Sequence, residues 1–347
     1  MTHAKLLLNF NENADTIRTS LSAVRHIGPH LWLGCDETAT LERLTLNGDQ
    51  ANDHHHFEVT EFLELPNSKD EEIDIEGIAY TDYYLWFVGS HSLKRKKVGP
   101  EKDFKDNVKR LRKIEREENR YTFGRIPLVD GQLFSACPHP DNPDLLLTAA
   151  QLRRKKNGNE LTDRLKEDPH LGDFLKAEIP GKDNGLDIEG LAVIGDRFLL
   201  GLRGPVLRGW SVLLELEVAE ADLGVLRLQK LDDTKDRYRK HFLDLGGLGI
   251  RDLCVWNDVL LILAGPTMEL SGPIRVFTLP LTALTTLEDT LLKPALLLEV
   301  PYGEGCDRAE GITVLDPNQQ DLLVVYDSPA SERLQGNQSI FADLVSL

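Results

Sequence analysis

The sequence lacks the features that mark a disulfide-stabilised or membrane-spanning protein. Only four of its 347 residues are cysteine, and they are widely separated, so neither a zinc ribbon nor a disulfide framework is expected. No apolar run approaches the roughly 18 residues that a transmembrane helix needs. The first residues do not resemble a signal peptide, and we therefore expect a cytoplasmic protein with reduced thiols and no membrane partner.

Positive charge is also scarce. The chain has 40 Lys and Arg against 57 Asp and Glu, a net charge of −17. This excess of acidic residues makes nucleic acid an improbable partner. Walker, Gly-x-Ser-x-Gly and His-Glu-x-x-His motifs are absent from the sequence, which removes the usual signatures of P-loop NTPases, α/β-hydrolases and zinc peptidases.

The chain does contain an internal repeat. Asp-Ile-Glu-Gly occurs at 74–77 and again at 187–190. Each copy is followed by a short apolar run, a polar turn and a second apolar run, and this pattern recurs six times at spacings of 54 to 62 residues. The six units begin at Ser22, Glu76, Ser135, Glu189, Arg251 and Glu310.

Further apolar runs flank these hairpins and supply outer strands. They lie at 62–66, 174–180, 241–245 and 295–301. Four strands per unit and six units predict an all-β protein, a six-bladed β-propeller with four-stranded antiparallel blades, in a single domain spanning 1–347. Residues 5–10 have no blade before them and the last blade lacks an outer strand, so we expect the N-terminal strand to close the last blade.

Two basic insertions interrupt the repeat, at about 92–120 and 151–174. Ten Lys and Arg against three Asp and Glu lie between Lys94 and Lys113. Phe104, Val108 and Leu111 have helical spacing, which predicts a partly helical cover at the channel mouth. This cover is either a solvated lid or a positive rim that attracts anionic ligands or an acidic protein partner.

The first residue of each innermost strand is expected to lie at one mouth of the central channel. Oxygen ligands suit hard cations such as Ca²⁺. The candidate ligands of a divalent cation are Glu76, Glu189, Glu310, Asp74, Asp187, Asp36 and Asp327. The candidate catalytic residues at the same mouth are His91, Arg203, Arg251 and Arg308. Three interpretations of the glutamates remain open: an architectural role, a metal site, or acid–base chemistry without a metal.

The Asp-x-Glu-Gly-[Ile/Leu]-Ala start of 74–79 and 187–192, with a looser copy at 308–313, resembles the phytase-like or esterase-like propeller superfamily. It is close to an uncharacterised bacterial family, a domain of unknown function. The resemblance implies Ca²⁺ at the channel mouth, held by Glu76, Glu189 and Glu310, and hydrolysis of phosphate esters or lactones.

Together these features predict a metal-assisted hydrolase of an anionic small molecule, with a phosphate ester as the first candidate. The alternative is a non-catalytic propeller that binds a ligand or a protein.

Overall fold

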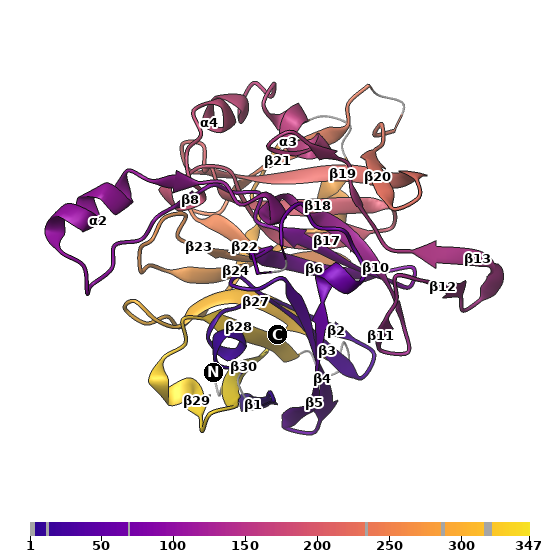
Figure 1. Ribbon diagram of the computed structural model, residues 1–347, viewed down its shortest axis with the longest axis horizontal. Coiled ribbons are helices and arrows are strands. Elements are labelled where there is room, and N and C mark those ends of the chain that lie inside the picture. The colour runs from indigo at the N-terminus through magenta and orange to yellow at the C-terminus, as the bar shows by residue number, and fades with distance from the viewer. Residues whose placement is uncertain (1–3, 12–13, 69, 233–234, 286–288, 316–320) are drawn as a thin grey trace.

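The computed structural model describes every residue except 1–3, 12–13, 69, 233–234, 286–288 and 316–320. The protein consists mainly of short antiparallel strands (Figure 1). Five strands form a closed inner ring in which each strand packs beside the next and the last beside the first. In ring order they are β2 (Leu21–Ile27), β6 (Ile75–Thr81), β17 (Asp187–Ile194), β22 (Gly249–Trp256) and β27 (Arg308–Val314).

Each inner strand begins a four-stranded antiparallel blade. Blade 1 continues with β3 (His30–Cys35), β4 (Thr40–Asn47) and β5 (Gln50–Glu58). Blade 2 continues with β7 (Tyr84–Gly89), β10 (Phe123–Val129) and β14 (Ala150–Leu152). Blade 3 continues with β18 (Arg197–Gly204), β19 (Trp210–Asp222) and β21 (Tyr238–Asp244). Blade 4 continues with β23 (Val259–Gly265), β24 (Ile274–Pro280) and β26 (Ala295–Val300).

The fifth blade is closed by the two ends of the chain. It contains β27, β28 (Asp321–Asp327), β30 (Ser339–Ser346) and β1 (Ala4–Asn9). Strand β1 pairs antiparallel with β30, with Leu6 opposite Ala342, and also touches the outer strand of blade 1 in a short parallel pairing. The predicted closure of the last blade by the N-terminal strand is confirmed.

The predicted count of six blades is wrong, because the unit that begins at Ser135 does not enter the ring. Its two strands, β12 (Ala136–His139) and β13 (Asn142–Thr148), pair with each other, and they project from the body at the right of Figure 1. Leu145 and Leu146 are half exposed, so this hairpin lacks the buried faces that a blade needs. An apolar run, a turn and a second apolar run describe any hairpin, and this one is an insertion in blade 2.

Two of the predicted outer strands also differ from the structure. The runs at 241–245 and 295–301 coincide with β21 and β26, but 62–66 is not a strand and 174–180 overlaps the helix α4 (Gly172–Lys176). The outer positions of blades 1 and 2 are filled by β5 and β14 instead.

The two basic insertions follow strands that run toward the same end of the channel, β7 and β14. The first is a ribbon of β8 (Lys94–Arg95) and β9 (Ile114–Glu115) that carries α2 (Phe104–Leu111) away from the body, at the left of Figure 1. The second contains β15 (Arg154–Lys155), β16 (Gly158–Asn159), α3 (Glu160–Leu165) and α4. Both are partly helical, as predicted.

One arginine inside the channel links several inner strands. Arg25 lies on β2, and its Nε donates to the carbonyl of Ile78 on β6 at 2.8 Å. Its Nη2 donates to the carbonyls of Leu253 on β22 at 2.8 Å and of Leu191 on β17 at 3.4 Å. These bonds are polar links across the ring.

Asp252 completes this link to the fifth blade. Its carboxylate lies 3.6 Å from Arg25 and accepts from the backbone N–H of Leu253 at 2.7 Å and of Ile312, on β27, at 2.8 Å. Burial raises the pKa of Asp252 to about 7, while Arg25 lowers it. All five inner strands therefore meet at one buried ion pair.

Replacing Arg25 by Met should leave the Asp252 carboxylate buried without its cation and destabilise the fold by about 3 to 5 kcal/mol. Urea denaturation followed by tryptophan fluorescence measures this. The control is Arg112→Met on an exposed site of the first insertion, which should change stability by less than about 0.5 kcal/mol. Equal stability of the two variants would show that the ion pair does not hold the ring.

Candidate functional site

Every inner strand has a register irregularity at the same level of the channel. In each of the five strands one residue is skipped in the pairing with the second strand of its blade. A bulge of this kind releases a residue from the ladder and redirects its side chain. The skipped residues are Ser22, Glu76, Glu189, Arg251 and Glu310, and all five are buried.

The predicted mouth residues are therefore equivalent positions in the ring, apart from Ser135, which is exposed on the projecting hairpin. The glycine that follows each glutamate lies against the next inner strand. A Cβ on Gly77 would lie 2.7 Å from Leu191, and one on Gly190 would lie 2.9 Å from Leu253. These glycines therefore allow close approach of neighbouring inner strands.

Two arginines neutralise one half of the mouth. Arg203, at the end of β18, pairs with Asp187 and, through its Nη1, with Oε1 of Glu189 at 2.5 Å. Nη1 of Arg251 bridges Glu189 at 3.0 Å and Glu310 at 2.7 Å. The repeated aspartate and glutamate of blade 3 are thus held by guanidinium groups in a buried network.

The equivalent aspartate of blade 2 has a partner from the first insertion. Asp74 pairs with Arg120, which also lies 3.3 Å from Glu72 and donates to the hydroxyls of Ser90 and Ser92 at 3.0 and 3.1 Å. Arg120 was not singled out in the sequence, because its position depends on how the insertion folds back.

The other half of the mouth holds carboxylates without an arginine. Glu76 is only 7% exposed, and no hydrogen bond or ion pair reaches its carboxylate from the described residues. The Oδ1 of Asp36 is buried and also lacks a hydrogen-bond partner within the described part of the chain. Asp327 accepts from Ser328 at 3.0 Å, and the nearest guanidinium, Arg308, is 3.9 Å away.

The pKa values of several carboxyl groups at the mouth are raised. Burial raises the pKa of Glu76 well above its usual range, and the carboxylates of Glu189, Asp74 and Glu310 raise it further. Burial also raises the pKa of Asp36. The pKa of Asp327 is raised to about 6 by burial and by Glu310. That of Glu189 is raised to about 7 by burial, although Arg203 and Arg251 lower it.

The mouth thus contains seven carboxylates and three buried arginines, Arg120, Arg203 and Arg251. All seven predicted metal-ligand candidates are brought to this region. Within the described residues, however, no three His, Cys, Asp or Glu side chains are grouped so that they could hold a metal ion. The oxygen donors suit Ca²⁺ in type, but their arrangement does not supply its ligand set.

His91 does not join this site. Its Nδ1 donates to the carbonyl of Gly89 at 2.7 Å, and its Nε2 accepts from the side-chain amide of Asn159 at 2.6 Å. Burial lowers the pKa of His91 to about 4, so the ring is neutral. It connects β7 to the second insertion, a structural role that the sequence could not indicate without the position of Asn159.

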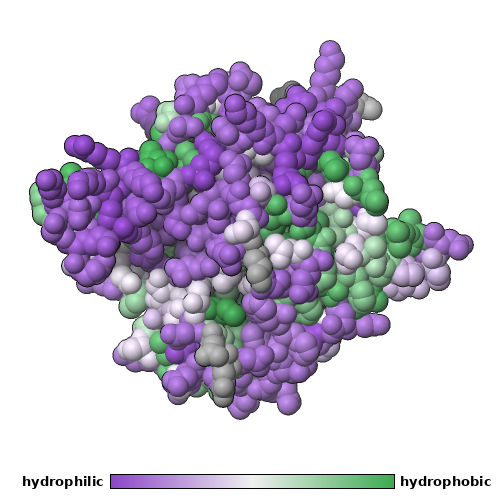
Figure 2. All heavy atoms as spheres, viewed as in Figure 1, coloured by the Kyte–Doolittle hydropathy of each residue, from purple (hydrophilic) through white to green (hydrophobic). Residues whose placement is uncertain are grey.

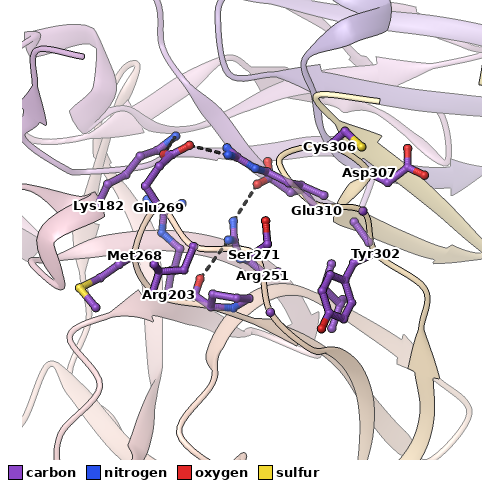
Figure 3. A pocket seen from close by; sticks show the side chains of 17 residues that line it. Lys182, Arg203, Arg251, Met268, Glu269, Ser271, Tyr302, Cys306, Asp307 and Glu310 are labelled. Carbon is purple, nitrogen blue, oxygen red and sulfur yellow. Dashed lines mark hydrogen bonds and ion pairs between the residues drawn. The ribbon is translucent and has the colours of Figure 1, made fainter. Parts of the chain in front are cut away.

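A pocket opens beside the mouth (Figure 3). Three of the predicted catalytic residues, Arg203, Arg251 and Arg308, line it together with Glu310. Lys182, in the short helical turn before β17, also lines the pocket. No sequence pattern indicates this residue.

Ion pairs connect the charged side chains at the rim of this pocket. Arg308 pairs with Glu269 at 2.5 Å, and Lys182 lies 3.7 Å from the same carboxylate. Figure 3 shows Glu269 beside Lys182 at the edge of the pocket. Glu269 lies in the segment between β23 and β24, outside the strands that the repeat identifies.

The histidine cluster at 53–59 lies elsewhere, in the outer strand β5. His54 and His56 contact the buried Glu42 at 2.8 and 2.9 Å, while His55 contacts Arg43 at 2.7 Å. Alternate residues of a strand face opposite sides, so the three rings do not converge.

The sequence family described as "Protein of unknown function (DUF3616)" matches residues 20–343. The chain belongs to this family. The match covers nearly the whole ring and agrees with the resemblance to a family of unknown function, but it does not support the phytase-like label. No curated protein matches the sequence. No helix in the described ranges is long and apolar enough to cross a membrane.

Several solved structures are loosely similar. Glutaminyl cyclase from Myxococcus xanthus is 11% identical over 99% of this chain and 98% of its own, with a TM-score of 0.43. The PQQ-bound aldose sugar dehydrogenase from Streptomyces coelicolor is 12% identical over 98% of both chains, with a TM-score of 0.40. The Cps50 (Swd1) β-propeller domain from Myceliophteria thermophila is 11% identical over 99% of this chain and 100% of its own, at 0.34. Structural similarity at this level supports no conclusion about function.

The mouth carboxylates should make stability depend on pH. A carboxyl group whose pKa is higher in the folded than in the unfolded state holds extra protons when folded, so it contributes less stability as pH rises from about 4 to its folded pKa. Glu76→Gln removes one such group. The variant should therefore match the parent protein at pH 5 and exceed it at pH 8, by up to about 1.4 kcal/mol for each pH unit of the shift.

Urea denaturation at pH 5 and pH 8 measures this difference. Glu64→Gln is the control, because Glu64 is exposed and its replacement should have the same small effect at both pH values. A Glu76→Gln variant that is less stable than the parent at pH 8 would show that Glu76 has a stabilising partner.

Proposed function

We propose that the channel mouth is the active site of a hydrolase that acts on a small anionic molecule, with a phosphate ester as the first candidate. The observation that carries this proposal is Glu76, a buried carboxyl group without a partner among the described residues, close to a pocket lined by cationic side chains. Such groups with displaced pKa values in a cleft are typical of catalytic sites.

The carboxyl groups of the mouth can divide the acid and base roles. Glu76, whose pKa burial and neighbouring carboxylates raise well above its usual range, holds a proton more readily than an ordinary carboxyl group and can donate it to a leaving group. Glu189, with a pKa of about 7, is partly ionised and can accept a proton from an attacking water. Two carboxyl groups with different environments are the usual basis of such a division.

The pocket supplies cationic groups for an anionic substrate. Arg203, Arg251, Arg308 and Lys182 line it, and the Nε of Arg203 has no acceptor among the described residues. Guanidinium groups bind phosphate and carboxylate oxygens with directed hydrogen bonds, and fixed cations stabilise charge that develops on an oxyanion.

The divalent cation predicted from the sequence remains a prediction. Because no described group of three ligands could hold it, the acid–base roles above do not depend on a metal.

A second candidate function is docking of an acidic protein, and helix α2 favours it. Phe104 is 86% exposed and Leu111 is 48% exposed, on a helix whose surroundings are almost entirely hydrophilic (Figure 2). The helix is nevertheless held in place: Asp103 caps its N-terminus, and Arg110 donates to the carbonyl of Lys97 at 2.6 Å. A fixed basic helix with exposed apolar side chains complements an acidic partner with an apolar pocket.

The hydrolase proposal predicts that Glu76→Gln lowers kcat/KM for a phosphate monoester by at least about 100-fold, because it removes a general acid. Hydrolysis of a panel of chromogenic phosphate esters, carboxylic esters and lactones by the parent protein and this variant is the measurement. Glu64→Gln should leave the rate unchanged. Equal rates for Glu76→Gln and the parent protein would refute the role of Glu76.

The same assay on chelator-stripped protein examines the predicted cation. A bound ion stabilises the folded state by mass action, so Ca²⁺, Mg²⁺ or Mn²⁺ should raise the Tm and the rate if the reaction is metal-assisted. Hydrolysis that persists without added ions contradicts the metal-assisted form.

The docking candidate predicts salt-dependent binding of an acidic polypeptide. Poly-L-glutamate, followed by fluorescence anisotropy, should bind the parent protein at low salt and dissociate as salt is raised. A triple Lys105→Glu, Lys109→Glu, Arg112→Glu variant should lose this binding. Stronger binding to phosphatidylserine vesicles or duplex DNA than to poly-L-glutamate would assign the helix to another class of partner.

A further inference from the structure

The charges at the mouth are divided unequally between its two sides. On the side of blades 3 and 4, Arg203 and Arg251 pair with Asp187, Glu189 and Glu310. On the side of blades 5, 1 and 2, no arginine or lysine in the described chain forms an ion pair closer than 3.9 Å with Asp327, or any with Asp36 and Glu76.

Lys182 also faces this acidic side. It acts through space on Asp36, Asp327 and Glu310, but its own ion pair is with Glu269 at 3.7 Å. Asp36 and Asp327 thus face this lysine without an ion pair closer than 3.9 Å among the described residues. An architectural ring would be expected to satisfy its buried carboxylates, because an unpaired buried charge is strongly destabilising.

A cationic group of a ligand can satisfy them. A metal ion needs several ligands at fixed short distances, and no described group of three side chains supplies them. A primary ammonium group places fewer demands on geometry, since it donates three rotatable hydrogen bonds and can reach carboxylates that surround it loosely. The acidic side therefore suits an organic ammonium better than a metal ion.

The cationic pocket indicates which other charged group such a ligand carries. Glu310 belongs to both regions: it lines the pocket with Arg203, Arg251 and Arg308 and raises the pKa of Asp36 and Asp327. The cationic side chains that line the pocket are of the kind that bind phosphate and carboxylate oxygens. An anionic group among these cations and an ammonium group on the acidic side would lie a few bonds apart.

We propose that the mouth binds a zwitterionic small molecule, with a primary ammonium on Asp36, Glu76 and Asp327 and a phosphate or carboxylate on Arg203, Arg251 and Arg308. This inference rests on the proposed function only in placing the substrate at the mouth, and it narrows the substrate from any anionic ester to one that carries an amine.

Isothermal titration calorimetry tests the inference directly. The probes are O-phosphoethanolamine, β-alanine, ethanolamine, inorganic phosphate and Ca²⁺. At least one zwitterion should bind ten or more times more tightly than either ethanolamine or phosphate alone, and comparison of O-phosphoethanolamine with β-alanine shows which anion the pocket prefers.

The variants separate the two ends of the ligand. Glu76→Gln and Asp36→Asn should each weaken zwitterion binding at least tenfold and leave phosphate binding unchanged, whereas Glu64→Gln should change neither. Zwitterions that bind no more tightly than phosphate, or tight Ca²⁺ binding that excludes ethanolamine, would overturn the proposal. Two variants are used so that one misfolded protein does not decide the result.

The outcome also separates this inference from the proposed hydrolysis. Tight zwitterion binding without turnover of any ester retains the binding site and refutes the hydrolase. Equal kcat/KM for phosphate esters with and without an amine retains the hydrolase and refutes the ammonium subsite.

Discussion

The structure depends on a guanidinium group inside the channel. Inner strands of neighbouring blades pack through side chains, and the glycines that allow this close packing contribute no side-chain contacts of their own. Arg25 donates to carbonyls of three other inner strands, and its neighbour Asp252 accepts from the fifth. Because Arg25 also lines the hollow at the opposite end of the channel, this pair lies between that hollow and the mouth. The mouth therefore lies above the Arg25–Asp252 ion pair in the channel.

The repeated Asp-Ile-Glu-Gly has three separate tasks in this arrangement. The aspartate pairs with a buried arginine, Arg120 in one copy and Arg203 in the other. The glutamate lies in a bulge that frees it from the ladder, and the glycine admits the next strand. The two copies differ in the glutamate alone: Glu189 is held by two arginines, whereas Glu76 is held by none in the described chain. Identical sequence thus places identical groups in different electrostatic environments.

Much of the fold could be predicted from the sequence, because the repeat identifies the inner strands and the residues that begin them. The closing strand could be predicted from the unmatched ends. The blade number could not, since the unit at Ser135 has the alternation of a hairpin, and the true blade starts at Ser22 and Arg251 lack the aspartate and glycine of the repeat as it does. The partners Arg120 and Lys182 come from insertions that no repeat governs, and the role of His91 depends on Asn159, which is distant in sequence. The charged residues of the mouth could be predicted from the sequence, but the ion pairs between them could not.

The contrast between Asp252 and Glu76 argues that the mouth is more than architecture. Both carboxylates are buried on inner strands of the ring, Asp252 on β22 and Glu76 on β6. Asp252 has two backbone donors and an arginine, so this chain can satisfy a buried carboxylate in its channel when stability requires it. Glu76 has no such partner within the described residues, although serine or glutamine would fill the same bulge without the electrostatic penalty. Local rules are broken in proteins chiefly where function requires it, and Glu76 breaks them beside Glu310, a carboxylate that raises its pKa and lines the cationic pocket.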